Sequence, residues 1–168
     1  MELWDILDEN AKPTGRLIDR RDRLGKGEYH LVVHIWVDNG HGLYLIQRRS
    51  TRLGFCPGMW APSGGSAITG ETSLQAAMRE LSEEMGITAP AESFRLVGRQ
   101  RRNHAFRDLW QITVSCCTQT HCQPEEVECA AWRSRCDIMS MVERGEFINY
   151  GDDYFKMIFP DKGVGFDC

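Results

Sequence analysis

The spacing of apolar residues changes along the chain, and each change predicts a different kind of element. A short apolar run at residues 3–7 predicts a first strand, which ends in a turn rich in Asp, Pro and Gly. The stretch HLVVHIWVDNGHGLYLIQRRS (30–50) predicts a hairpin, because two β-rich runs flank Asn39-Gly40. Further strands are expected within residues 94–103, 106–116 and 127–133.

Between these strands the apolar period lengthens to that of a helix, from Thr72 to Met85. Its apolar stripe has steps of four, three and four and consists of Leu74, Met78, Leu81 and Met85. Thr72 or Ser73 can cap the start, and Gly86 suits a left-handed C-terminal end. Two more helices are expected within residues 136–147 and 152–159. This order predicts one domain over residues 1–168, an α/β (α+β) fold with a mixed sheet and helices on its faces.

Three glutamates of the central helix, Glu80, Glu83 and Glu84, are spaced i,i+3 and i,i+4 and so share one face. At 100° per residue this face is predicted to lie roughly opposite the apolar stripe. A solvated acidic face is one interpretation, although like charges at this spacing cost a few tenths of a kcal/mol per pair and oppose the helix dipole. Magnesium binding is the other, because Mg²⁺ prefers oxygen ligands. The spacing alone leaves both open.

Composition and charge narrow the classes of partner. The chain has 168 residues, of which 42% are hydrophobic and 26% charged, as in ordinary globular proteins. A net charge of −4 argues against a nucleic-acid polymer, but not against a small anionic substrate. No apolar run reaches the ~18 residues of a membrane span, and MELWDILDEN lacks the features of a secretory signal. The sequence therefore predicts a cytoplasmic protein with no membrane partner.

Cysteine is abundant, with seven residues, an odd number, and no CxxC pair. These residues are interpreted as reduced thiols. Cysteine and histidine fall together in CCTQTHC (116–122), but the spacing does not fit a zinc knuckle. We therefore expect structural thiols there.

The helical glutamates belong to a longer pattern at residues 65–87. From Gly65 the order is five residues, Glu71, seven residues, Arg-Glu-Leu, one residue, Glu-Glu, one residue and Gly-Ile. It resembles the 23-residue Nudix box, G-x5-E-x7-R-E-U-x-E-E-x-G-U with U a bulky aliphatic residue, at all nine constrained positions. The flanking GEYHLVVHIWV, LIQRRS and PGMW resemble the Nudix subgroup related to isopentenyl-diphosphate isomerase.

This resemblance implies a Nudix α/β/α sandwich that hydrolyses a diphosphate linkage with Mg²⁺, for which Mn²⁺ can substitute. The implied substrate is a small molecule, with a nucleoside di- or triphosphate or another nucleoside diphosphate derivative as the first choice. The implied metal ligands are Glu80, Glu83, Glu84 and the loop carbonyl at Gly65. The implied catalytic group is Glu71, Arg79, Glu80 and Glu83, in which a Glu71–Arg79 pair fixes the loop against the helix.

Residues outside the box leave alternatives open. The general base is either a box glutamate or an acid of a later loop, Glu125 or Glu126, whose bland interpretation is a solvated turn. One of Arg48 and Arg49 should point inward, where it can hold a phosphate, although both can be surface residues. Trp60 either stacks on the substrate or, as we favour, fills the core. The basic run 98–104 either attracts phosphates or protects an edge strand.

Two rival functions remain. The isomerase carries a Cys-Gly-His segment where this chain has Gly64-Gly65-Ser66, so the thiol and one metal-binding histidine are absent. His30 matches another isomerase histidine, but a core role is expected for it and for His34. An inactive nucleotide sensor is the second rival, and the intact acids argue against it. The sequence leaves the oligomeric state open, with a homodimer as one option.

Overall fold

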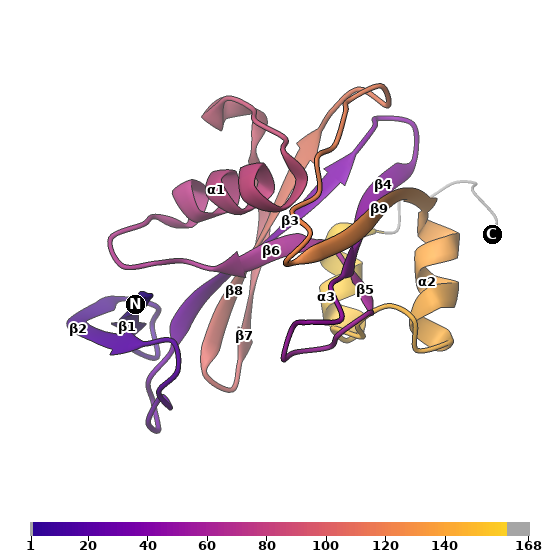
Figure 1. Ribbon diagram of the computed structural model, residues 1–168. Coiled ribbons are helices and arrows are strands. Elements are labelled where there is room, and N and C mark those ends of the chain that lie inside the picture. Colours follow the sequence, from indigo (N-terminus) through magenta and orange to yellow (C-terminus); the bar gives the residue numbers. More distant parts are fainter. Residues whose placement is uncertain (1, 161–168) are drawn as a thin grey trace.

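The computed structural model describes residues 2–160 as three layers, with a mixed sheet between α1 on one face and α2 and α3 on the other (Figure 1). The helices are α1 (Ser73–Met85), α2 (Arg135–Glu143) and α3 (Asp152–Ile158), with a 3-10 turn at Ala91–Ser93. The strands are β1 (Leu3–Leu7), β2 (Pro13–Asp19), β3 (His30–Asp38), β4 (Leu43–Arg49), β5 (Trp60–Ala61), β6 (Ser63–Ser66), β7 (Arg95–Arg102), β8 (Ala105–Thr113) and β9 (Val127–Ser134). The predicted mixed α+β fold is confirmed.

The main sheet has seven strands and centres on β3. Its path is β5-β4-β3-β8-β7, with β6 added on β3 and β9 on β4. Strands β3 and β8 run parallel, and the other pairs are antiparallel. β1 and β2 form a separate two-stranded sheet that projects beside the N-terminal end of α1 (Figure 1).

The predicted hairpin of residues 30–50 exists, but its strands pair only beside the turn. Val37 pairs with Leu45 and Asp38 with Tyr44. Farther from the turn β3 pairs with β6 over Val32–Ile35, while β4 pairs with β9. The two strands of the predicted hairpin therefore separate away from the turn. In the region where they are apart, Ser63–Ser66 of β6 pairs with the central strand β3.

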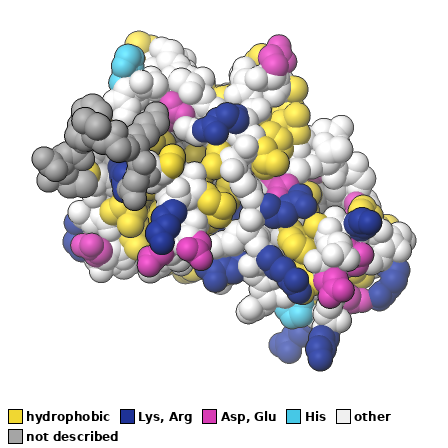
Figure 2. Space-filling view, turned by 180° about the vertical axis from the view of Figure 1, so that it is seen from behind, with side chains coloured by type: hydrophobic (Ala, Val, Ile, Leu, Met, Phe, Trp, Pro, Cys, Tyr) yellow, Lys and Arg dark blue, Asp and Glu magenta, His cyan; other side chains and the backbone are white. Residues whose placement is uncertain are grey.

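Two apolar cores lie on the two faces of the sheet. Val33, Ile35 and Val37 point toward α1 and pack with its Leu81 and Met85. The intervening Trp36 packs on the other side, with the aromatic side chains of α3. The alternation along β3 therefore decides which core each residue joins. The space-filling view from behind shows Lys and Arg side chains among the apolar ones of that face (Figure 2).

Cysteine chemistry follows the prediction in part. Free thiols are found in the structure at Cys56, Cys116, Cys117, Cys122 and Cys129. Cys136 is disulfide-bonded, so the prediction of reduced thiols is wrong for this residue.

Among residues 2–160, none of the helices combines the length and the apolar composition that a membrane span requires.

Candidate active site

The acidic side of α1 faces solvent only in part. Thr72 caps the helix in a capping box with Gln75, and Gly86 ends it in the left-handed conformation, so the predicted ends are confirmed. However, Glu80 and Glu84 are 8% and 2% exposed. The interpretation as a solvated acidic face is therefore wrong for these two residues, because β6 packs against this side of α1. Glu83 alone is exposed.

Glu84 is held against the first glycine of β6. Its Oε2 accepts a hydrogen bond from the Gly64 backbone N–H at 2.8 Å. Burial nevertheless raises the pKa of Glu84 to about 8, although the side chain of Gln47 on β4 acts in the opposite direction. The Nε2 of Gln47 is itself buried without a hydrogen-bond partner in the described structure. Gln47 was not identified from the sequence. A polar residue at an inward-facing position of a largely apolar strand could have indicated it.

Glu80 lies directly over the second glycine. A Cβ built at Gly65 would be 2.5 Å from Glu80 Oε1, so only glycine leaves room for this carboxylate. Burial raises the pKa of Glu80 to about 7, although Arg79 acts in the opposite direction. Two buried carboxyls with raised pKa values form a place that a cation would stabilise.

Arg79 connects the loop to the acids. Its Nε and Nη2 donate to the two oxygens of Glu71 at 2.7 and 3.0 Å, and Nη2 also donates to the Ser66 carbonyl at 3.1 Å. Its Nη1 donates to Glu80 at 2.8 Å and to Glu83 at 3.0 Å. The structure thus contains the Glu71–Arg79 pair that the box implied. Arg79 and Glu83 also line an open hollow of about 450 Å³.

The donor set suits a hard divalent cation, although the acids are not arranged as ligands. Within residues 2–160 no three His, Cys, Asp or Glu side chains form a ready metal-binding group. Arg79 occupies oxygens of Glu80 and Glu83. Carboxylate oxygens beside the backbone of Gly65 are nevertheless the donors that Mg²⁺ prefers. The residues therefore fit such an ion once Glu83 leaves Arg79.

The loop before β9 runs close to these acids. Gln123 N–H donates to the Glu84 carbonyl at 3.1 Å, which fixes the loop on the C-terminal end of α1. The negative charge of Glu126 contributes to the raised pKa of both Glu80 and Glu84. Glu126 is thus within electrostatic reach of the box.

The two arginines of LIQRRS differ. Arg48 is exposed, bonds to the Gly58 carbonyl and lies 3.5 Å from Glu128. Arg49 is half-buried and lowers the pKa of His34 by its charge, an effect smaller than that of burial. A shift in register after Arg48 turns Arg49 toward the interior.

Trp60, a predicted substrate-binding residue, is half-buried and packs on the core of the α2 and α3 face. The buried His34 bonds through Nδ1 to the Tyr154 hydroxyl at 2.7 Å, and His30 stacks on Trp4.

Comparison with known proteins assigns the family. The model of the NUDIX domain matches residues 28–148. The chain is 38% identical to an uncharacterised Nudix hydrolase of Listeria monocytogenes over 89% of this chain and 90% of the relative. The chain belongs to the Nudix family. An isopentenyl-diphosphate Delta-isomerase of Pectobacterium atrosepticum is 36% identical, but over only 49% of this chain and 46% of the isomerase. The crystal structure of DR0079 from Deinococcus radiodurans shares the fold, with 21% identity, a TM-score of 0.79 and coverage of 96% and 100%.

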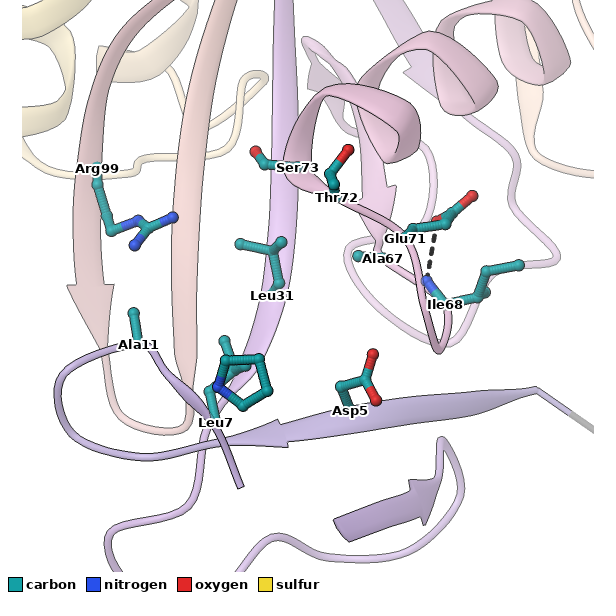
Figure 3. A pocket seen from close by; sticks show the side chains of 11 residues that line it. Asp5, Leu7, Ala11, Leu31, Ala67, Ile68, Glu71, Thr72, Ser73 and Arg99 are labelled. Atoms are coloured by element: carbon teal, nitrogen blue, oxygen red, sulfur yellow. Dashed lines mark hydrogen bonds between the residues drawn. The ribbon is translucent and has the colours of Figure 1, made fainter. Parts of the chain in front are cut away.

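The three helical glutamates of the Nudix box do not line the cavity that lies between the β1–β2 sheet and the start of α1, although Glu71 does. This cavity has a volume of about 160 Å³ and is seen in Figure 3. Glu71 lies at its wall and accepts from the Ile68 N–H at 3.0 Å, while Arg99 faces it from β7 (Figure 3). None of Glu80, Glu83 and Glu84 is among its lining residues, so we place the Nudix site outside this cavity.

The raised pKa values of this Nudix hydrolase give a prediction for its metal-free stability. Glu80 and Glu84 have pKa values of about 7 and about 8 when folded, against an ordinary value of 4.5. Between about pH 5 and pH 8 the folded state therefore binds more protons than the unfolded state, so the free energy of unfolding falls as pH rises. We expect a lower Tm at about pH 8.5 than at about pH 5.5 in the presence of a chelator, measured by calorimetry.

Mg²⁺ added at the higher pH should raise the Tm again, because a ligand that binds only the folded state stabilises it. Glu84→Gln is the matched control and should flatten the profile, since it removes the more strongly shifted carboxyl. A metal-free Tm that rises across this pH range would contradict the argument.

Proposed function

We propose that this Nudix hydrolase uses Mg²⁺, with Mn²⁺ as a substitute, to cleave the diphosphate linkage of a nucleoside di- or triphosphate or a related derivative. The observation that carries the proposal is the pair of buried carboxyls, Glu80 and Glu84, set against the glycines of β6. Buried acids with raised pKa values destabilise a fold unless a ligand uses them. Glu83, exposed beside them, completes a set open to a solvated substrate.

Each residue has a distinct task in the proposed reaction. Glu80, Glu83, Glu84 and the carbonyl of Gly65 would hold the metal, which polarises the phosphate oxygens and lowers the pKa of water. Glu83 or Glu126 takes the proton of the attacking water. Arg79 fixes the loop through Glu71 and holds Glu83 until the substrate arrives.

The isomerase alternative meets a steric obstacle at the first glycine of β6. A Cβ at Gly64 would lie 2.1 Å from the Val33 carbonyl oxygen, and the φ of 154° suits glycine only. The isomerase cysteine would therefore not fit here without a shift of β3. Cys56 does not replace it, because it packs on the core of the α2 and α3 face.

The test is a panel of diphosphates incubated with the purified protein and Mg²⁺, with Mn²⁺ and a chelator in parallel. The panel includes nucleoside di- and triphosphates, nucleotide sugars, dinucleoside polyphosphates and isopentenyl diphosphate, and released phosphate or pyrophosphate is measured. We expect metal-dependent release from a nucleotide. Isomerisation of isopentenyl diphosphate would favour the rival enzyme. Nucleotide binding without turnover of any compound would favour the sensor.

A further inference from the structure

Three arginines gather around the buried Tyr150, and none of them has a carboxylate partner within residues 2–160. Arg49 donates from Nε to the Phe55 carbonyl at 3.0 Å. Arg102 donates from Nη2 to the backbone carbonyl of Tyr150. Arg107 is the third. Other arginines of this protein hold carboxylates closely, as Arg16, Arg79 and Arg99 do.

Arg107 of β8 differs from the other two because one of its buried donors has no hydrogen-bond partner in the described structure. It is half-buried, and its guanidinium carbon lies 4.8 Å from the centroid of the Tyr150 ring and 5.8 Å from that of Tyr154. Nη1 donates to Gln100 at 2.9 Å, but Nε is buried without a hydrogen-bond partner. Burial, and then the charge of Arg102, lower the pKa of Arg107. A desolvated cation with an unpaired donor costs free energy until an acceptor reaches it.

The arginines and the Nudix acids are connected by contacts across the sheet. Glu84 accepts from the Gly64 N–H, and a Cβ at Gly64 would come within 3.1 Å of His34 Cδ2. The His34 ring lies 4.8 Å from that of Tyr150, on which Arg107 rests. The charges of Arg107, Arg49 and Glu84 all act on the pKa of Tyr150, which burial raises. Glu84, Gly64, His34 and Tyr150 therefore form a chain of contacts that connects the acids with the arginine cluster.

The chemistry of this cluster selects an anion. A neutral ring could stack on the tyrosines, but it would leave the positive charges of Arg49, Arg102 and Arg107 uncompensated. A phosphate offers several acceptor oxygens to the guanidinium fork and neutralises the charge. Glu83 does not neutralise these arginines, because it already pairs with Arg79.

We propose that Arg107 is a specificity-determining residue that binds the free terminal phosphate of the substrate whose cleaved linkage lies at Glu80, Glu83 and Glu84. This inference rests on the proposed function and narrows its substrate class. The enzyme then prefers nucleoside di- or triphosphates with an unesterified terminal phosphate over diphosphates esterified at both ends, such as nucleotide sugars.

Binding of inorganic pyrophosphate in the presence of a chelator tests the subsite without catalysis. Isothermal titration calorimetry should show Arg107→Met weakening this binding by about 10-fold or more. Arg95→Met is the matched control, because it removes the same charge from an exposed arginine of the neighbouring β7, and it should change the affinity by less than about twofold. Arg107→Lys retains the charge and keeps the measurement possible if the Met variant fails to fold; it should still bind several-fold more weakly.

The kinetic arm compares two substrates in the same variants. For a substrate with a free terminal phosphate, Arg107→Met should raise KM by about 10-fold and Arg107→Lys should raise it several-fold, each with little change in kcat, while KM for a nucleotide sugar should stay nearly constant. Equal effects of Arg107→Met and Arg95→Met on pyrophosphate binding, or equal effects on both substrates, would overturn the proposal. Arg107-dependent pyrophosphate binding without any hydrolysis would instead refute the proposed function and leave the subsite standing.

Discussion

Glu83→Gln should lower kcat for magnesium-dependent hydrolysis by about 100-fold or more, because it removes a proposed metal ligand and base. The side chain is 54% exposed, and its recorded contact is the one from Arg79 Nη1 at 3.0 Å. The fold should therefore hardly change, and the Tm of the variant should stay close to that of the parent. Steady-state kinetics with the best substrate of the panel, and calorimetry of the same samples, make the measurement.

Glu92→Gln is the control for this substitution, because Glu92 is an exposed glutamate of the 3-10 turn, outside the box. It removes the same charge and should leave kcat unchanged. Hydrolysis that survives Glu83→Gln undiminished would refute the assignment of the site. Equal losses in Glu83→Gln and Glu92→Gln would show that overall charge, not a role of Glu83, sets the rate.

Gly64→Ala should lower the free energy of unfolding by about 3 kcal/mol, the upper end of what overpacking usually costs. The new Cβ would lie 2.1 Å from the Val33 carbonyl oxygen and 3.0 Å from His34 Cα, both backbone atoms of the central strand. Neither can move without distorting the pairing of β3 with β6. Chemical denaturation measures the loss, and activity should fall with it, since Glu84 binds the same glycine.

Gly70→Ala separates the clash from backbone strain. Gly70 also has a positive φ, 82°, but a Cβ there would meet nothing within 4 Å. Its cost should be about 1 kcal/mol, the price of a left-handed residue alone. If Gly64→Ala cost no more than Gly70→Ala, the close approach of β6 to β3 would not matter for stability.

Much of this protein was accessible from local sequence patterns. The helix ends at Thr72 and Gly86 followed from capping chemistry, which depends on neighbours in the chain. Strands β3, β4, β7, β8 and β9 followed from apolar runs between turn residues, whereas β6 did not, because Ser63–Ser66 contains no apolar run. The Glu71–Arg79 contact followed from the Nudix resemblance, because the box fixes a loop and a helix within one short segment.

The burial of the acids could not be predicted in this way. The helical period placed Glu80 and Glu84 away from the apolar stripe, yet both are buried under β6. The reason is that β3 pairs with β4 only at Val37 and Asp38 and pairs with β6 over Val32–Ile35, and this second pairing depends on contacts between distant residues. A helical wheel describes one helix, whereas burial depends on what packs against it.

The sequence by itself determined the family of chemistry, because the spacing of Gly65, Glu71, Arg79 and the glutamates is local and chemical. Only the tertiary structure decided the environment of those groups. It put the glutamates in a buried place that raises two of their pKa values, brought Glu126 within electrostatic reach, and set Arg49 and Arg107 around Tyr150. Desolvation and charge pairing act through space, so the pKa values of these groups depend on residues that are far apart in the chain.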